Sequence, residues 1–145
     1  MNILLDTSVL VAAMVETHSA HETAFQCLRR MKNGEENGFA AAHSLAESFS
    51  VLTRLPVEPR ISPAIALELI QNNVIDICTI VPLTAEDYKA VISHLSKRGL
   101  SGGVTYDALI VHAGIKAGVD RIITLNQKDF RRVYPEFSDK IGAPK

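Results

Sequence analysis

The chain has 145 residues, of which 47% are hydrophobic and 21% are charged, and its formal net charge is −1. A chain of this length and apolar content supports one hydrophobic core, which excludes a disordered protein and predicts a single domain over residues 1–145. The small net charge excludes a chain-wide basic surface, so any contact with nucleic acid must be local.

Short apolar segments alternate with amphipathic ones in the first half of the chain. Hydrophobic periodicity and capping residues predict the strand Asn2–Leu5, the helices Thr7–Met14 and His18–Lys32, the strand Phe39–Ala42, and the helices Ser44–Leu55 and Ser62–Val74. Two prolines support these boundaries. Pro56 stops the helix before it, and Pro63 lies at a first helical position, where its missing N–H costs nothing.

The second half of the chain continues this alternation. It predicts the strand Cys78–Val81, the helix Thr84–Lys97, a loop at Gly99–Gly103, the helix Asp107–Ala117, the strand Arg121–Thr124, the helix Asn126–Val133 and an edge strand over Lys140–Ala143. Alternating strands and helices are typical of an α/β fold with a mostly parallel sheet. Ligands of such folds bind beyond the carboxyl ends of the strands, so the residues that follow each strand are the candidates for chemistry.

The two cysteines indicate a reducing compartment. Cys27 and Cys78 lie in apolar stretches without a Cys or His at metal-ligand spacing, so we expect neither a disulfide framework nor a zinc site. The apolar run Ser8–Val15 follows Asp6 rather than a Lys or Arg, which disfavours a secretion signal. No apolar run has the length of a membrane span, and we expect a cytoplasmic protein.

Acidic and amide side chains follow the predicted strands. Asp6 comes after the first strand, Glu47 lies early in the helix after the second, Asp107 opens a later helix, and Asn126 and Asp129 follow the last long strand. Converging carboxylates repel one another unless a cation or a proton intervenes, and oxygen ligands suit Mg²⁺ or Mn²⁺. One or two such ions would lower the pKa of a bound water and direct it at a phosphodiester.

Helix capping is a competing explanation for the same residues. Asp6 and Asp107 both lie where a helix begins, so either could be an N-cap or a first-turn acid that complements the helix dipole. Ser44 and Glu47 have the spacing of a capping box. Taken one at a time, these positions do not distinguish a metal site from a set of caps.

Four segments, in order, resemble the motifs of PIN domains and together run from Ile3 to about Val133. They are Leu5-Asp6-Thr7-Ser8-Val9-Leu10, then Ala46-Glu47 with the downstream Thr53-Arg54-Leu55-Pro56, then Tyr106-Asp107-Ala108-Leu109-Ile110, and finally Thr124-Leu125-Asn126-Gln127-Lys128-Asp129-Phe130. The resemblance implies a PIN-like three-layer fold, in which a mostly parallel central sheet is flanked by helices. It also implies a metal-dependent endoribonuclease.

The resemblance also implies residue roles and partners. Asp6, Glu47 and Asp107 would be the catalytic ligands of Mg²⁺ or Mn²⁺. The chain is similar to VapC-like toxins, which implies an RNA substrate, a homodimer and a cognate antitoxin that blocks the cleft. We expect the antitoxin to bind a groove between the helices at 18–32 and 62–74.

The last motif departs from the family pattern. The fourth acidic position falls on Asn126, and Asp129 is the alternative ligand. Fewer fixed charges would weaken metal affinity and make a second ion doubtful. The hydroxyls of Thr7, Ser8 and Thr124 are candidates for orienting a carboxylate or a metal-bound water.

Other functions remain open at this stage. A PIN nuclease that is not a toxin would fit the same motifs, and a degenerate acidic-pocket binding module is favoured by Asn126. An aspartyl phosphatase with Asp6 as nucleophile is disfavoured because Ser8 stands where such enzymes need a second acid. His43 could be a general base or a metal ligand, whereas His112 is expected to serve packing or a core hydrogen bond.

Overall fold

Five parallel strands form one sheet in the computed structural model, which describes residues 1–145. The order across the sheet is β3-β2-β1-β4-β5, so the first strand is central and pairs with β2 and β4. The strands are β1 Asn2–Leu5, β2 Asn37–Ala41, β3 Thr79–Val81, β4 Arg121–Ile123 and β5 Ile141–Gly142. The predicted α/β fold with a parallel sheet is confirmed.

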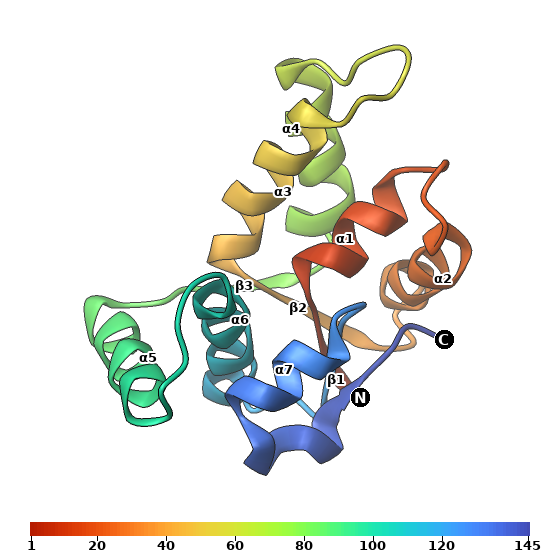
Figure 1. Ribbon diagram of the computed structural model, residues 1–145. Coiled ribbons are helices and arrows are strands. Elements are labelled where there is room, and N and C mark those ends of the chain that lie inside the picture. The colour runs from red at the N-terminus through yellow and green to blue at the C-terminus, as the bar shows by residue number, and fades with distance from the viewer.

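Helices cover both faces of this sheet, as Figure 1 shows. They are α1 Thr7–Met14, α2 His21–Lys32, α3 Ala42–Arg54, α4 Pro63–Ile70, α5 Ala85–Lys97, α6 Val104–Ala117 and α7 Gln127–Val133, with a π-helical turn η1 Gln71–Ile75 and a 3₁₀ turn η2 Pro135–Lys140. One face carries α1 and α2, and the other carries α5, α6 and α7. The α3–α4 pair projects from the body as an arm, and no helix is both long and apolar enough to cross a bilayer.

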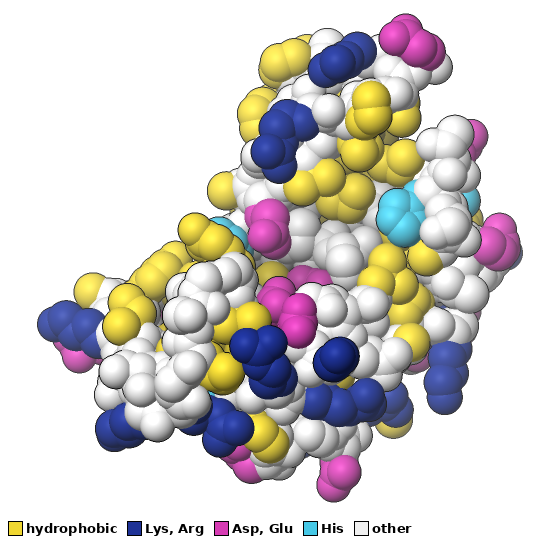
Figure 2. All heavy atoms as spheres, viewed as in Figure 1, with side chains coloured by type: hydrophobic (Ala, Val, Ile, Leu, Met, Phe, Trp, Pro, Cys, Tyr) yellow, Lys and Arg dark blue, Asp and Glu magenta, His cyan; other side chains and the backbone are white.

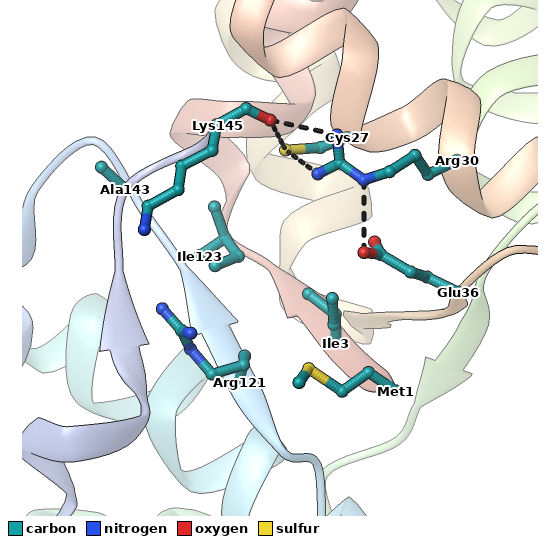
Figure 3. Close-up of a pocket in the computed structure, with 9 residues that line it drawn as sticks. All are labelled: Met1, Ile3, Cys27, Arg30, Glu36, Arg121, Ile123, Ala143 and Lys145. Carbon is teal, nitrogen blue, oxygen red and sulfur yellow. Dashed lines mark hydrogen bonds and ion pairs between the residues drawn. The ribbon is translucent and has the colours of Figure 1, made fainter.

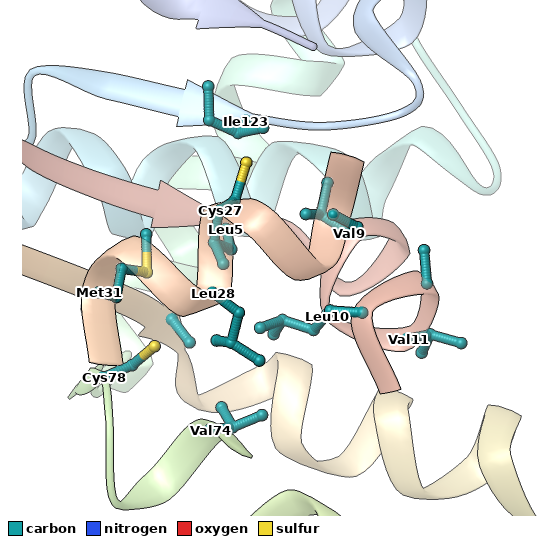
Figure 4. Close-up of a cluster of buried hydrophobic side chains, with 14 of the residues drawn as sticks. Leu5, Val9, Leu10, Val11, Cys27, Leu28, Met31, Val74, Cys78 and Ile123 are labelled. Atoms are coloured by element: carbon teal, nitrogen blue, oxygen red, sulfur yellow. The ribbon is translucent and has the colours of Figure 1, made fainter. Parts of the chain in front are cut away.

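Successive side chains of β1 point to opposite faces of the sheet, so this strand contributes to a hydrophobic core on each face. Ile3 and Leu5 pack with α1 and α2, whereas Leu4 packs with α6 and α7. Figure 4 shows the first of these clusters, in which both cysteines lie. Cys27 and Cys78 are buried and not joined, and burial raises the pKa of Cys78 to about 11. A thiol with this pKa stays protonated at neutral pH and packs as a small apolar side chain.

The predicted capping box at Ser44 and Glu47 is wrong. β2 continues into a helix that already begins at Ala42, so Ser44 lies inside the first turn and is fully buried. Its Oγ accepts a 2.9 Å hydrogen bond from Thr7 Oγ1 instead of a backbone amide. The two helices that follow β1 and β2 are thereby tied together at their first turns.

The predicted start of the helix at Asp107 is also wrong. The helix α6 begins at Val104, three residues earlier, because Gly102 and Gly103 turn the chain and Thr105 donates its hydroxyl to the Gly102 carbonyl at 2.8 Å. Asp107 therefore lies in the first turn of α6 rather than at its N-cap. Its carboxylate makes no backbone capping contact and is available to the site.

Two helices begin within one residue of the predicted position, and the remaining boundaries move by a few residues. Ser62 accepts from the amide of Ile65, and Thr84 forms a reciprocal capping box with Asp87. The helix that was expected to begin at His18 begins at His21 instead. The His18 ring accepts a hydrogen bond from the backbone amide of Ala20, which precedes the helix. The helix expected over Ser62–Val74 changes to a π-helical turn after Ile70, and the last strand is shorter than expected.

Candidate active site

A pocket of about 360 Å³ opens beyond the carboxyl ends of β1 and β4, beside the arm formed by α3. Its lining is Asp6, Thr7, Ser8, Val11, His18, Glu47, Val51, Leu55, Asp107 and Asn126. Three of these side chains are carboxylates, and none is a Lys or an Arg. Figure 2 shows acidic side chains in the hollow at the centre of this face, with hydrophobic side chains on the arm above.

Asp6 lies at the base of the pocket with 5% of its surface exposed. One carboxylate oxygen, Oδ2, accepts a 2.7 Å hydrogen bond from Ser8 Oγ and a 2.8 Å bond from Thr124 Oγ1. Asp6 is the residue before α1, but its side chain makes no cap hydrogen bond. The capping explanation therefore fails at this position. Burial raises the pKa of Asp6, and the two hydroxyls and the nearby charge of Glu47 act with smaller and partly opposite effects.

The same hydroxyls tie Asp6 to the turn after β4. Thr124 Oγ1 accepts from the Asn126 amide at 2.9 Å, and Ser8 Oγ accepts from the Leu125 amide at 3.1 Å. Each hydroxyl thus receives a backbone hydrogen bond while it donates to Asp6. The Thr7 hydroxyl does not reach Asp6, because it donates to Ser44. Of the three predicted orienting hydroxyls, two contact the carboxylate directly.

Asp107 lines the same pocket as Asp6 and Glu47, in a strongly acidic environment. Its pKa is raised to about 7, first by partial burial and then by the negative charges of Asp6, Asp129 and Glu47. Like charges gathered in a desolvated pocket favour the neutral form of one member. A cation at this position would remove the penalty and return Asp107 to its charged form.

The amide of Asn126 lies between two acids. Its Nδ2 donates to Asp129 Oδ2 at 3.0 Å and reaches Asp107 Oδ2 at 3.5 Å. Asn126 lines the pocket, whereas Asp129 does not, and Asp129 also lies 3.9 Å from Arg132 Nη1. Asn126, one of the two candidates for the fourth acidic position, is therefore a hydrogen-bond donor between the carboxylates of Asp107 and Asp129.

Glu47 enters the pocket from α3 beside a pair of stacked rings. His43 lies one turn earlier, with Nε2 3.9 Å from Glu47 Oε2, and this nitrogen has no hydrogen-bond partner. The imidazole stacks on Tyr106 with ring centroids 5.2 Å apart and planes 6° from parallel. Tyr106 directly precedes Asp107 and is 51% exposed. The rim of the acidic pocket thus carries an exposed aromatic face.

The donor set fits a hard divalent cation. Three carboxylates and an amide supply oxygen ligands without a competing Lys or Arg, and burial together with the neighbouring acids raises the pKa of Asp107. No three His, Cys, Asp or Glu side chains lie close enough to enclose an ion by themselves. An ion held by Asp6, Glu47 and Asp107 would therefore need waters between it and some of these carboxylates, and Mg²⁺ and Mn²⁺ retain such waters.

Two histidines differ in their relation to the pocket. His18 lines it, a placement that no pattern in the sequence indicated. His112 lies on α6 away from the pocket, with Nε2 2.9 Å from Asp87 Oδ1. This contact agrees with the hydrogen-bonding role predicted for His112.

Comparison with known proteins identifies the family of this chain. The family model described as the PIN domain matches residues 3–135. The chain belongs to the PIN domain family. Ribonuclease VapC40 of Mycobacterium tuberculosis is 35% identical to it over 128 residues, which cover 88% of this chain and 87% of that protein. Ribonuclease VapC27 of the same organism is 31% identical over 109 residues, or 75% and 74% of the two chains. The predicted resemblance is confirmed.

Solved structures share the fold of this PIN domain. VapBC2 from Rickettsia felis, bound to a fragment of promoter DNA, gives a TM-score of 0.68 at 19% identity and covers all of both chains. VapC20 of Mycobacterium tuberculosis, described as a sarcin-ricin loop cleaving toxin, gives 0.65 at 18% identity and covers 83% of this chain and 86% of that one. At these identities the likeness concerns the fold alone, and the predicted PIN-like architecture is confirmed.

Proposed function

We propose that this PIN domain is a Mg²⁺- or Mn²⁺-dependent endoribonuclease of the VapC type, which hydrolyses RNA phosphodiester bonds. The observation that carries the proposal is the convergence of Asp6, Glu47 and Asp107 on one pocket that lacks a basic side chain. The family and the ribonuclease relatives support the same conclusion. An acidic pocket repels an RNA phosphate unless a cation is present, so the geometry itself favours metal-dependent chemistry.

The residues of the pocket have different roles in the proposed reaction. Asp6, held by Ser8 and Thr124, is the most rigid carboxylate and would anchor a metal ion with Glu47 and Asp107. The bound ion would lower the pKa of a water and neutralise charge on the phosphate. Asn126 donates to Asp107 and so orients that carboxylate toward the pocket. No covalent intermediate on the protein is needed, because a metal-bound water would be the nucleophile and the Ser8 hydroxyl is held in its hydrogen bond to Asp6.

Unpaired RNA is the substrate class that the rim favours. Tyr106 is half exposed, stacked on His43 from one side, and directly precedes Asp107. A base that is not held in a duplex can stack on such a ring, whereas a paired base cannot leave its helix without cost. We therefore propose that Tyr106 binds a base next to the scissile phosphate.

We propose that a cognate antitoxin covers the groove between α2 and α4. This groove of about 500 Å³ is lined by residues of α1, α2, α4 and η1, among them Phe25, Leu69 and Asn73. Phe25, which lines the groove, is 41% exposed. An amphipathic segment laid into this groove would bury its ring.

The resemblance to VapC-like toxins further implies a homodimer that works in the cytoplasm. Tyr88 and Ile92, one turn apart on α5, are 41% and 59% exposed and form an apolar face away from the antitoxin groove. We propose this face as the dimer contact. Light scattering of the purified chain tests it, because Ile92→Lys should convert a dimer to a monomer.

Separate Glu47→Gln and Asp107→Asn variants test the nuclease proposal. Each removes one charge from the pocket with little change of shape, and each should abolish metal-dependent cleavage of an RNA pool. Glu86→Gln, at an exposed position of α5, is the matched control and should cleave as the unaltered chain does. If neither pocket variant changes cleavage, the nuclease assignment fails. If the folded, unaltered chain binds RNA without cutting it, a degenerate binding module becomes the better description.

A further inference from the structure

A second pocket lies on the α2 face of the sheet and extends along β1 and β4. Its cavity measures about 150 Å³ and is lined by Met1, Ile3, Cys27, Arg30, Glu36, Arg121, Ile123, Ala143 and Lys145. Figure 3 shows it enclosed by α2, the first residues of β1 and β4, and the segment after β5. Its side chains include three cations and one anion, so it has an excess of positive charge. The ribonuclease proposal assigns it no role.

The two arginines of this pocket differ in their hydrogen bonding. The guanidinium of Arg30 is fully engaged, because it donates to Glu36 Oε1 at 3.2 Å, to the Lys145 carbonyl at 3.0 Å and to Cys27 Sγ at 3.3 Å. The guanidinium of Arg121 has no hydrogen bond or ion pair, and its Nε is shielded from solvent. An unsatisfied buried donor is costly, and a charged one more so. The chain itself supplies no anion for Arg121.

The backbone leaves room for this unpaired guanidinium. Gly142 of β5 is buried beside it, and a Cβ at that position would clash with Arg121 Nη2. In Figure 3 the amine of Lys145 and the guanidinium of Arg121 point into the same part of the pocket. Two like charges placed in this way repel one another unless an anion lies between them.

Glu36 adds a second requirement. One of its oxygens pairs with Arg30, whereas Oε2 is buried and has no donor. A ligand that accepts from Arg121 and also donates to a carboxylate would satisfy both unpaired groups. Hydrogen phosphate has both properties, because it carries anionic oxygens and a hydroxyl, whereas sulfate carries no proton at neutral pH.

We propose that this pocket binds a hydrogen phosphate group, either free or at the end of a small phosphomonoester. Arg121 and Lys145 hold its anionic oxygens, and the P–OH group donates to Glu36. The apolar side chains of Ile3 and Ile123 close one side and exclude water, which strengthens the charged hydrogen bonds. The cavity admits the phosphate group and little more, so larger parts of a monoester would extend past the segment after β5.

Calorimetric titration of the full chain with sodium phosphate, glycerol 3-phosphate and sodium sulfate at pH 6.5 tests the proposal. Constant ionic strength and EDTA prevent a metal in the acidic pocket from recruiting the anion. We expect phosphate to bind, Arg121→Gln to weaken binding by about tenfold or more, and the exposed Arg98→Gln to leave it unchanged. Sulfate should bind at least about tenfold more weakly than phosphate, and Glu36→Gln should narrow this difference.

The outcomes separate clearly. Tighter binding of glycerol 3-phosphate assigns the pocket to a monoester, and tighter binding of inorganic phosphate assigns it to the free ion. Lys145→Gln, at an exposed position that cannot threaten the core, gives a second measure if Arg121→Gln does not fold. The proposal is overturned if phosphate does not bind, if it binds no better than sulfate, or if every foldable pocket variant binds as the unaltered chain does.

Discussion

The Thr124 hydroxyl donates a 2.8 Å hydrogen bond to Asp6 Oδ2, although 118 positions separate the two residues. Because β1 and β4 are neighbours in the sheet, their carboxyl ends bring these side chains together. The same hydroxyl accepts from the Asn126 amide, so one side chain fixes both the first acid of the site and the turn that carries Asn126. The rigidity of the pocket depends on this contact.

Thr124→Val should weaken metal binding although every carboxylate of the pocket is still present. Valine keeps the shape but removes one of the two hydroxyls that donate to Asp6 and the acceptor of the Asn126 amide. We expect metal affinity to fall by about 10–100-fold and the free energy of unfolding to fall by about 1–3 kcal/mol. Mn²⁺ titration and urea denaturation measure the two effects. Thr23→Val, on the exposed face of α2, is the control, and an equal loss in both variants would remove the special role of Thr124.

The raised pKa of Asp107 predicts that the metal-free protein loses stability as the pH rises. The folded-state pKa of about 7 lies above the ordinary value of 3.8, so between these values the folded chain binds more protons than the unfolded chain. Its stability therefore falls from about pH 4 to about pH 7, and the loss is complete above the folded pKa. Asp107→Asn should flatten this decline.

Thermal denaturation in EDTA at pH 5 and pH 8 measures this effect. The Tm of the unaltered chain should fall relative to that of Asp107→Asn as the pH rises. Adding Mn²⁺ should restore the unaltered chain more at pH 8 than at pH 5, because the cation competes with a proton for the carboxylate. Asp139→Asn, at an exposed position, should follow the unaltered chain. Parallel curves for all three proteins would contradict the assigned environment of Asp107.

Asn126→Asp should shift the balance between stability and metal binding. The substitution removes the donor to Asp107 and Asp129 and adds a third negative charge beside them. We expect the Tm in EDTA to fall and the affinity for Mn²⁺ to rise several-fold, because more ligand charge strengthens the binding of a hard cation. Asn72→Asp adds the same charge on η1, far from the pocket, and should do neither. Unchanged affinity would show that position 126 does not face the ion.

Tyr106→Ala should raise KM for a single-stranded RNA about tenfold, since the loss of one base stack costs about 1–3 kcal/mol. kcat should change little, because Tyr106 does not touch the carboxylates. Tyr106→Phe keeps the ring and should behave as the unaltered chain. Phe25→Ala on α2 controls for the loss of an exposed aromatic ring, because the assay contains no antitoxin. Equal effects in the alanine and phenylalanine variants would point to the hydroxyl instead of the ring.

The order of strands and helices was predictable from hydrophobic periodicity, but the hydrogen-bond partner of each polar side chain was not. Thr84 and Asp87 form their cap within four residues, so local spacing was sufficient. Ser44 has the same kind of spacing with Glu47, yet tertiary burial against Thr7 decides its role. A local pattern cannot report a partner that is 37 positions away.

The acids proposed for the site were predictable from their places in the chain, because Asp6 directly follows β1, Glu47 lies in the helix after β2, and Asp107 lies near the start of α6. The contacts that surround these acids could not be predicted from the sequence. Tyr106 belongs to a recognised motif, but its stack on His43 joins two different helices. The pairing of Asn126 with Asp107 depends on where α6 begins, and that start was misplaced by three residues because the glycine-rich turn closes early.

Cleavage of a mixed RNA pool by the purified, antitoxin-free chain tests the central claim most directly. The reactions contain Mg²⁺, Mn²⁺ or EDTA, and Asp6→Asn serves as the inactive control, with its fold checked by circular dichroism. We predict cutting in at least one metal, loss of cutting in EDTA, and none with Asp6→Asn. Cutting that persists in EDTA or in the Asp6→Asn variant, or no cutting in any metal by the folded chain, would contradict the account.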